Sequence, residues 1–248
     1  MNDRRTQGVM LLLVGAIALW LGLSDAALAY VRAALRLPLA ASGLVLLLLG
    51  LVALLWRPAG EMASHGHGHG HGEDGPRSAW LLILPVVVLL LVTPPALGAY
   101  AASRQAPGSD GGSVGDFPPL PEPVDGVVPL LVNDFVSRAL YDRQRSLEGE
   151  RVRLFGFVVP DKGGGQEYQL ARFSLFCCAA DAQAYTVVVR GDAVPRQADQ
   201  WLLVEGRWLP EPVAEKLAPS TKSPVLITDS VTTVGPPADP YEHGLYGF

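Results

Sequence analysis

The chain has 248 residues, of which 49% are hydrophobic, and a formal net charge of −5 at pH 7. Its mean hydropathy is positive, which is high for a soluble protein, and the apolar residues concentrate in the first hundred positions. The acidic excess falls on residues 101–248, and this disfavours binding to nucleic acid, because a phosphate backbone takes clustered Lys and Arg.

Three apolar runs dominate the N-terminal part of the chain, at 9–24, 39–56 and 80–100. A helix needs about 20 predominantly apolar residues to cross the hydrocarbon of a bilayer. We therefore predict membrane helices near 9–30, 39–56 and 80–100, so that residues 1–100 form a transmembrane region. Aromatic residues typical of interfacial anchors stand at the ends of the runs: Trp56, Trp80 and Tyr100.

The first apolar run has a second interpretation, a secretory signal that is cleaved. Arg4 and Arg5 precede the run, and the small residues "ALA" at 27–29 resemble a cleavage site. Both interpretations leave the C-terminal part on the same side of the membrane. The arginines near the runs lean toward a cytoplasmic N-terminus, so we expect a multi-pass protein with an extracytoplasmic C-terminal domain.

A histidine-rich loop lies between the second and third runs, at 64–72. Its four histidines alternate with glycine: His65, His67, His69 and His71. Neutral imidazole is a ligand for zinc, copper and nickel, and the glycines leave the backbone free to move. This pattern favours a loose metal-collecting loop, and the alternative is a solvated low-complexity loop without metal.

A Pro-, Gly- and Ser-rich linker is predicted at 101–126, followed by a domain at 127–248. The apolar stripe of "PLLVNDFVSRAL" predicts one helix. Five strand-like segments follow, at 151–159, 167–178, 184–190, 200–208 and 224–230. Short strands with internal glycines predict an all-β domain, a five-stranded OB-like barrel with one preceding helix. A small open β-sandwich is the alternative.

The two cysteines of the chain, Cys177 and Cys178, are adjacent. Consecutive residues of a straight strand point to opposite faces, so both thiols reach one ion only if the chain turns. The sequence "CCAADA" suits a turn, and a turn would bring Asp181 close to Cys178. Thiolates select soft metals such as zinc. Two alternatives stay open, buried packing of both thiols and a redox role for an exposed thiolate of low pKa.

Two further residues are candidate partner-binding positions. Arg172 would pair with Asp181 across the turn, contact a partner, or lie as a solvated charge on its strand. Trp201 and Trp208 are seven positions apart in one strand region, so they point to opposite faces. One of them is expected in the core, and we assign the partner surface to Trp208. No nucleophile–base pair, phosphate loop or pair of catalytic carboxylates is recognisable, so we expect no enzymatic activity.

Four segments together resemble a known family: "LYDRQRSLEGERVRLFGFV" (140–158), "ARFSLFCCAADA" (171–182), "QWLLVEGRW" (200–208) and "DPYEHG" (239–244). They are similar to the bacterial membrane proteins of the YcgQ type, the DUF1980 family. In that family an N-terminal hydrophobic region precedes a tethered β domain, and the proteins are encoded beside a multi-helix permease.

The resemblance implies an accessory subunit of a permease in the bacterial plasma membrane, with a link to zinc homeostasis. It also implies functional roles for Arg172, Cys177, Cys178 and Asp181. The histidine loop fits this link. Two other functions remain open on the residues alone: a structural assembly protein of the cell envelope whose cysteines are core packing, and an envelope thiol-redox protein.

Overall fold

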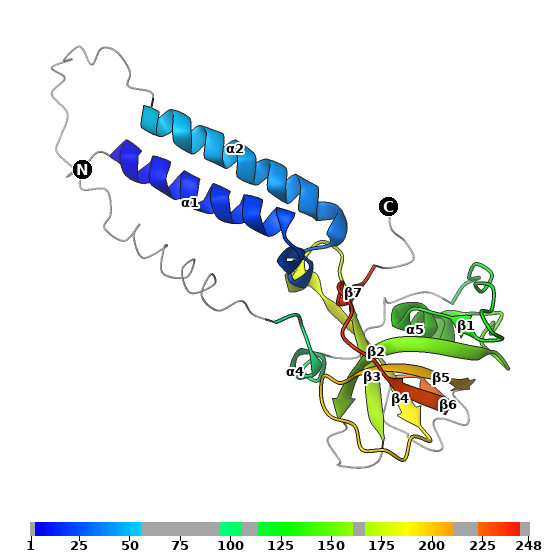
Figure 1. Cartoon of the computed structure of the whole chain (residues 1–248). Helices are drawn as coiled ribbons and strands as arrows, with labels where there is room; N and C mark the ends of the chain where they lie inside the picture. Colours follow the sequence, from blue (N-terminus) through cyan, green and yellow to red (C-terminus); the bar gives the residue numbers. More distant parts are fainter. Residues whose placement is uncertain (1–2, 56–94, 106–113, 161–166, 211–222, 244–248) are drawn as a thin grey trace, which may run out of the picture. The chain divides into compact units, whose positions relative to one another are not determined.

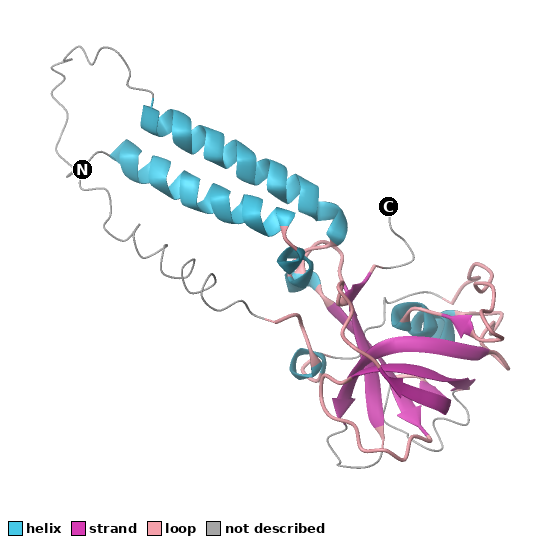
Figure 2. Cartoon of the chain, viewed as in Figure 1, coloured by secondary structure: helices cyan, strands magenta, loops and turns pink. Residues whose placement is uncertain are grey.

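The computed structural model describes residues 3–55, 95–105, 114–160, 167–210 and 223–243 (Figures 1 and 2). The chain divides into two compact units. The first comprises Met1–Ala27 and Ala34–Pro95, and the second comprises Leu28–Ala33 and Ala96–Phe248. The predicted histidine loop, and all of the predicted third membrane helix before residue 95, lie outside the described residues.

The first unit contains two long helices, α1 (Asp3–Leu23) and α2 (Arg36–Leu55), which pack against each other. Glycines repeat every seven residues along α1, at Gly8, Gly15 and Gly22. A Cβ atom at Gly15 would lie 2.8 Å from the backbone nitrogen of Leu47, and Gly43 of α2 has a similarly close neighbour. Small residues at this spacing therefore let the two backbones approach closely, as in helix pairs within membranes.

Among the described residues, two segments are long and apolar enough to cross a membrane, Thr6–Leu23 and Ala33–Leu55. The first helix ends at Leu23, earlier than predicted, and the chain continues in two 3-10 helices, η1 (Asp25–Ala29) and η2 (Ala33–Leu35). At the end of the predicted third helix the structure describes only the short α4 (Ala99–Ala102). The third crossing stays a prediction.

The second unit is built on one mixed, seven-stranded sheet. Its strands are β1 (Val128–Pro129), β2 (Arg151–Pro160), β3 (Tyr168–Ser174), β4 (Gln183–Arg190), β5 (Trp201–Leu209), β6 (Val225–Thr233) and β7 (Tyr241–Glu242). The five longer strands match the five predicted segments in place and order. The predicted N-terminal helices and β-rich C-terminal domain are thus confirmed.

The strand order is β1-β2-β5-β6-β4-β3-β7, and a further pairing joins β2 to β3. The five long strands therefore form a ring of pairings that returns to β2 (Figure 1). Within this ring β4 and β6 are parallel and the other pairs are antiparallel. The short strands β1 and β7 add parallel pairings to β2 and β3.

Two glycines lie inside strands of the sheet. A glycine at such a position is expected at a bulge or where another backbone comes close. Gly156 lies just before the point where β2 extends its pairing from β5 to β3, and a Cβ there would lie 2.7 Å from the carbonyl oxygen of Ala171. Gly206 lies beside the irregularity in the β5–β6 register, where a Cβ would overlap the carbonyl of Ile227. Both positions need a residue without a side chain.

Two hydrophobic clusters use opposite sides of the strands. One joins the ring strands to α5 (Val132–Tyr141) through residues such as Leu154, Leu170 and Phe135. The other includes Phe157 and Phe173, together with residues 96–102. Leu154 and Phe157 of β2 belong to different clusters because alternate side chains of a strand face opposite ways. The helix predicted from the apolar stripe is confirmed as α5.

The described parts of the predicted linker contact the domain. The backbone at Gly115 exchanges hydrogen bonds with Tyr141 and Arg143, and the carbonyl of Pro118 accepts a hydrogen bond from Arg138 at 2.9 Å. Residues 114–126 and 96–105 are therefore part of the second unit in this structure, whereas the sequence predicts a free tether. Arg138 of α5 and the backbone nitrogen of Arg143 supply donors that the composition of the linker does not predict.

Candidate metal site

The adjacent cysteines lie in the loop that joins β3 to β4. β3 ends at Ser174, before the thiols, and β4 begins at Gln183, so that these two residues pair at the base of the loop. Within the loop, residues Ala179–Asp181 form the 3-10 turn η4. The predicted turn at "CCAADA" is confirmed, while the strand predicted through Cys178 ends four residues earlier.

Asp181 holds this turn by collecting backbone N–H groups. Its carboxylate oxygens accept hydrogen bonds from the backbone nitrogens of Phe176 at 2.9 Å, Cys177 at 2.8 Å and Cys178 at 3.3 Å. Its burial acts to raise the pKa, but the hydrogen bonds from the Cys177 thiol and these N–H groups outweigh it and lower the pKa of Asp181. Asp181 is thus the turn-forming residue that its sequence position predicts.

The two thiols lie side by side, with 3.7 Å between the Sγ atoms of Cys177 and Cys178. Two sulfur ligands at about 2.3 Å from one tetrahedral zinc ion lie about 3.8 Å apart. The ligand atoms of both cysteines and Asp181 all lie within 4.8 Å of one another, which makes these three residues a group that could hold a metal ion. The donor set of two sulfurs and one oxygen fits zinc or another soft divalent metal.

The carboxylate of Asp181 has a second use in this group. Two oxygens offer about four acceptor positions, and three backbone N–H groups and the Cys177 thiol occupy them. A metal that displaces the thiol proton of Cys177 would therefore free one carboxylate position for itself. Three protein donors leave one tetrahedral position open, as in zinc sites that exchange ligands.

The electrostatics of Cys177 disfavour the redox alternative. The hydrogen bond to Asp181, and then the one to Cys178, raise the pKa of the Cys177 thiol to about 12. A reactive redox cysteine needs the opposite, a thiolate stabilised at neutral pH by nearby positive charge. These two hydrogen bonds thus disfavour the thiolate of Cys177.

The thiols are also accessible. Cys177 is exposed and Cys178 is half-buried, and Phe176 beside them is 84% exposed. The alternative in which both cysteines are core packing is therefore wrong, because neither side chain is enclosed. The loop tip offers both sulfurs to a ligand that arrives from solvent.

Residues Leu28–Ala33, which belong to the second unit, pair with this turn. Val31 and Cys178 form an antiparallel bridge, in which the Arg32 nitrogen donates to the Cys177 carbonyl at 3.1 Å and the Ala179 nitrogen to the Tyr30 carbonyl at 2.7 Å. The backbone that carries the thiols is therefore fixed from two directions, by Asp181 and by this segment.

Arg172 lies elsewhere than expected. Its side chain is 7% exposed, and its Nε atom lies 3.8 Å from a carboxylate oxygen of Glu242. The rings of Phe155 and Trp201 flank the guanidinium at 5.2 Å and 5.0 Å. The solvated charge and the Asp181 pair expected from the sequence are replaced by this buried contact, because β3 turns Arg172 into the domain. Direct contact of Arg172 with a partner is thereby disfavoured.

Glu242 is a second carboxylate that collects backbone N–H groups. It accepts hydrogen bonds from Val132 at 2.8 Å and Asn133 at 2.9 Å, at the start of α5. Its burial outweighs these bonds and the charge of Arg172, and raises the pKa of Glu242 to about 7. Glu242 therefore joins the C-terminal tail to α5 and to β3.

The two tryptophans of β5 take opposite faces, as predicted. Trp201 packs with Phe157 and residues 96–101, whereas Trp208 packs on the cluster that contains α5. The Arg145 guanidinium lies 5.6 Å from the Trp208 ring. Both rings are half-buried, so the partner surface assigned to Trp208 stays a prediction.

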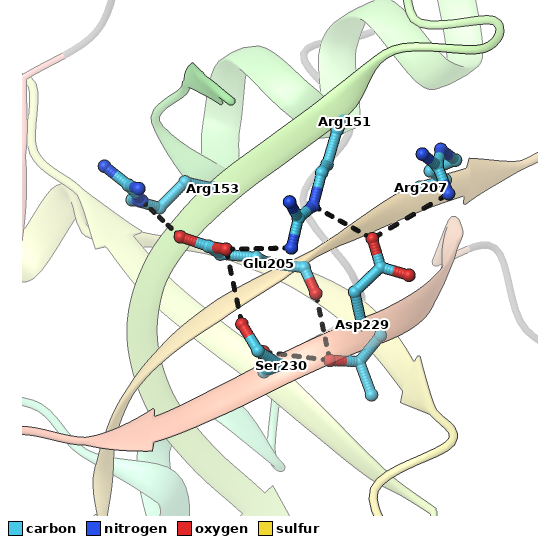
Figure 3. Close-up of polar contacts among 7 residues, drawn as sticks. Arg151, Arg153, Glu205, Arg207, Asp229 and Ser230 are labelled. Atoms are coloured by element: carbon cyan, nitrogen blue, oxygen red, sulfur yellow. Dashed lines mark hydrogen bonds and ion pairs between the residues drawn. The ribbon is translucent and has the colours of Figure 1, made fainter. Parts of the chain in front are cut away.

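A charged cluster on β2, β5 and β6 lies apart from these residues (Figure 3). Glu205 binds Arg153 at 2.7 Å and Arg151 at 3.2 Å, and Asp229 binds Arg151 at 3.0 Å. The hydrogen bond from Arg153 is the main reason that the pKa of Glu205 is lowered. Because each acid is matched by an arginine, this cluster joins three strands and offers no free acidic ligand set.

The sequence did not assign roles to three residues that build the site's surroundings, Glu242, Tyr241 and Gln105. The first two stand in "DPYEHG", one of the segments of family resemblance. The many polar side chains of this tail could have indicated that it contains functional residues. Gln105 stands in the predicted linker and has no such signal. The expected histidine ligands, His65 to His71, lie outside the described residues.

No curated protein matches the chain. A family model, described as the DUF1980 C-terminal domain, matches residues 133–243. This range contains α5, the five ring strands, the Cys177–Asp181 turn and the tail with Glu242. This part of the chain belongs to the DUF1980 family.

Proposed function

We propose that this chain is an accessory subunit of a membrane permease and that its Cys177–Asp181 turn binds zinc, or another soft divalent metal, as the transported cargo. The observation that carries the proposal is the geometry of the turn. Two accessible sulfurs 3.7 Å apart, with a carboxylate in the same group, suit a metal that is taken up and released. An open coordination position lets a partner's donor replace a ligand.

The N-terminal helices support a membrane location. Two of them are long and apolar enough to cross a bilayer, and the glycine stripe between them is the packing of membrane helices. In our proposal they anchor the domain in the bacterial plasma membrane, next to a multi-helix permease and its lipid. The third predicted helix then puts the domain outside the cytoplasm. The histidines at 65–71 serve as a low-affinity collecting loop on the other side.

The ring of strands supports an OB-like barrel as the fold of the domain. Five strands close through β2 and β3, with a helix, α5, packed against the ring. Such small closed sheets present ligands on their loops. In the proposed barrel Cys177 and Cys178 lie in the loop that joins its second and third strands, β3 and β4.

The test is a zinc titration of the full-length chain in detergent against a competing chelator. Four proteins separate the two candidate sites: the wild type, Cys177→Ser/Cys178→Ser, a variant with His65, His67, His69 and His71 changed to Asn, and the combination of both. Serine and asparagine keep side-chain size and polarity while removing the soft or imidazole donor. We expect one tight equivalent in the wild type that is absent from the cysteine variant and present in the histidine variant.

The result that overturns the proposal is equal zinc binding by the wild type and the cysteine variant. If the wild type then binds no zinc at all, a structural assembly role without a metal, with the cysteines exposed rather than packed in the core, takes its place. The membrane orientation has its own test, a reporter enzyme fused after Phe248. Activity only from a reporter that works in the cytoplasm would overturn the extracytoplasmic domain.

A further inference from the structure

The turn with the two thiols is joined to the chain segments that border the predicted membrane helices. Residues Leu28–Ala33 lie between α1 and α2 in the sequence, and 96–105 comprise the end of the third apolar run and the residues after it. Both segments belong to the second unit. The first pairs with the backbone of Cys177 and Ala179, as described above.

Gln105 binds the other end of the same turn. Its side-chain amide donates to the Ala182 carbonyl at 3.1 Å and accepts from the Ala184 nitrogen at 3.0 Å. A side chain that satisfies a donor and an acceptor two residues apart copies the pairing of a neighbouring strand. The exit of the turn is therefore fixed by residues of the 96–105 segment.

The hydroxyl of Tyr241 joins the two segments at one atom. It donates to the Ala29 carbonyl at 2.8 Å and accepts from the Leu97 nitrogen at 3.1 Å. The residue is 3% exposed, and its ring packs in the cluster that contains Phe173 and Leu175. The β3 end that leads into the thiol turn thus contacts the same ring that holds Ala29.

We propose that metal binding at Cys177 and Cys178 is coupled to the docking of residues 28–33 on the domain, with Tyr241 as the positioning residue. This inference rests on the proposed metal site. The peptide groups of Cys177–Ala179 carry the thiols and also pair with Tyr30 and Arg32. A metal that holds both sulfurs fixes this backbone, and so makes it a better partner for the segment.

The coupling acts in both directions. If metal strengthens the docking of residues 28–33, then docking must strengthen metal binding by the same factor. Since residues 28–33 join α1 to α2 covalently, occupancy of the thiols acts on the connection between the two apolar helices. Metal binding at the site thereby affects the part of the chain that we propose contacts the permease.

The experiment uses the full-length chain in detergent, with and without zinc. Amide exchange measures the protection of residues 28–33, and chelator competition measures zinc affinity. Tyr241→Phe removes only the hydroxyl oxygen that bonds to Ala29 and Leu97. Tyr168→Phe is the matched control, because Tyr168 is equally buried and loses a hydrogen bond to Asp192 at 3.1 Å, away from both segments.

We expect zinc to slow exchange in residues 28–33 of the wild type and of Tyr168→Phe. We expect Tyr241→Phe to bind zinc about fivefold or more weakly and to lose most of the zinc-dependent protection. Arg32→Pro is a second variant, which removes the donor to Cys177 without touching the domain's core. It should behave like Tyr241→Phe, and it decides the matter if Tyr241→Phe does not fold.

Three outcomes separate the two proposals. Zinc binding with unchanged exchange in residues 28–33, and with wild-type affinity in the variants, overturns the coupling while the metal site stands. Loss of affinity in Tyr168→Phe to the same degree overturns the specific role of Tyr241. The absence of any zinc binding by the wild type overturns the metal site and the coupling together.

Discussion

Two carboxylates of this protein do similar work in opposite surroundings. Asp181 accepts three backbone N–H groups at an exposed turn, and Glu242 accepts two at the buried start of α5. The pKa of Asp181 is lowered, whereas burial raises the pKa of Glu242 to about 7 although Arg172 lies nearby. The backbone hydrogen bonds favour the charged form in both places, but only at Glu242 does desolvation outweigh them.

The largest effect is expected from removing Glu242. Glu242→Ala leaves the guanidinium of Arg172 buried without its counter-ion, and leaves Val132 and Asn133 without their acceptor. Breaking one half of a buried pair costs about 3–5 kcal/mol. Thermal or urea unfolding of the full-length chain measures this loss. The double variant Arg172→Met/Glu242→Gln should recover much of this stability. An equal loss of stability in Glu242→Ala and in the double variant would contradict the assignment of Glu242 as the counter-ion of Arg172.

The second prediction concerns the pH dependence of stability. Because the folded-state pKa of Glu242 lies above its ordinary value, the fold favours the protonated acid. Its contribution is fully present below about pH 4.5 and is lost as pH rises through about 7, on the order of 3 kcal/mol in all. Melting temperatures across this range, taken with a chelator present, should slope less in Glu242→Gln.

The matched control for this slope is Glu167→Gln. Glu167 is half-exposed and pairs with Arg190 at the surface, so this substitution should keep the slope of the wild type. If the melting temperature of Glu242→Gln changes with pH as steeply as that of the wild type, the pH dependence belongs to other groups. The pKa of Glu242 would then not differ from that of Asp181 in the way described above.

A smaller effect is expected at the exposed carboxylate. Asp181→Asn weakens the acceptor of Phe176 and Cys177 N–H, at a cost of about 1 kcal/mol, and removes a candidate metal donor. Since the pKa of Asp181 is lowered, its contribution is present at neutral pH and lost as pH falls through the folded-state pKa. Zinc affinity and melting temperature measure the two effects, with Asp116→Asn, an exposed acid paired with Arg143, as control.

The smallest effect is expected in the surface cluster of Figure 3. Glu205→Gln keeps a polar group between Arg153 and Arg151 and removes the charge. Partly exposed ion pairs contribute about 0–1 kcal/mol, so unfolding measurements should show at most this loss, and less at high salt. A loss equal to that of Glu242→Ala would mean that burial does not separate these carboxylates.

Much of the domain was predictable because local patterns report burial directly. Alternation at 151–156 of β2 and along β5 identified strands, since one face of the chain is buried there. The glycines at 156 and 206, which predicted a curved sheet, stand where another backbone comes close. The turn at Cys177–Asp181 was predictable as well, since small residues and an aspartate form it within a few positions.

The surroundings of Arg172 were not predictable in the same way. Its strand position allowed either face, and its counter-ion Glu242 stands 70 positions away in the sequence. Only the parallel pairing of β7 with β3 brings the two together. The docking of residues 28–33 gave no signal at all, because the contact uses backbone atoms that every residue shares.

The sequence by itself determined the two apolar helices, the five strands and the turn with the two cysteines, since each follows from a spacing or composition within a short window. The tertiary structure alone decided which carboxylate is buried, which segment holds the thiols and which hydroxyl joins the segments. These depend on the closure of the ring and on where the tail returns. Long-range pairing sets them, and no local pattern records it.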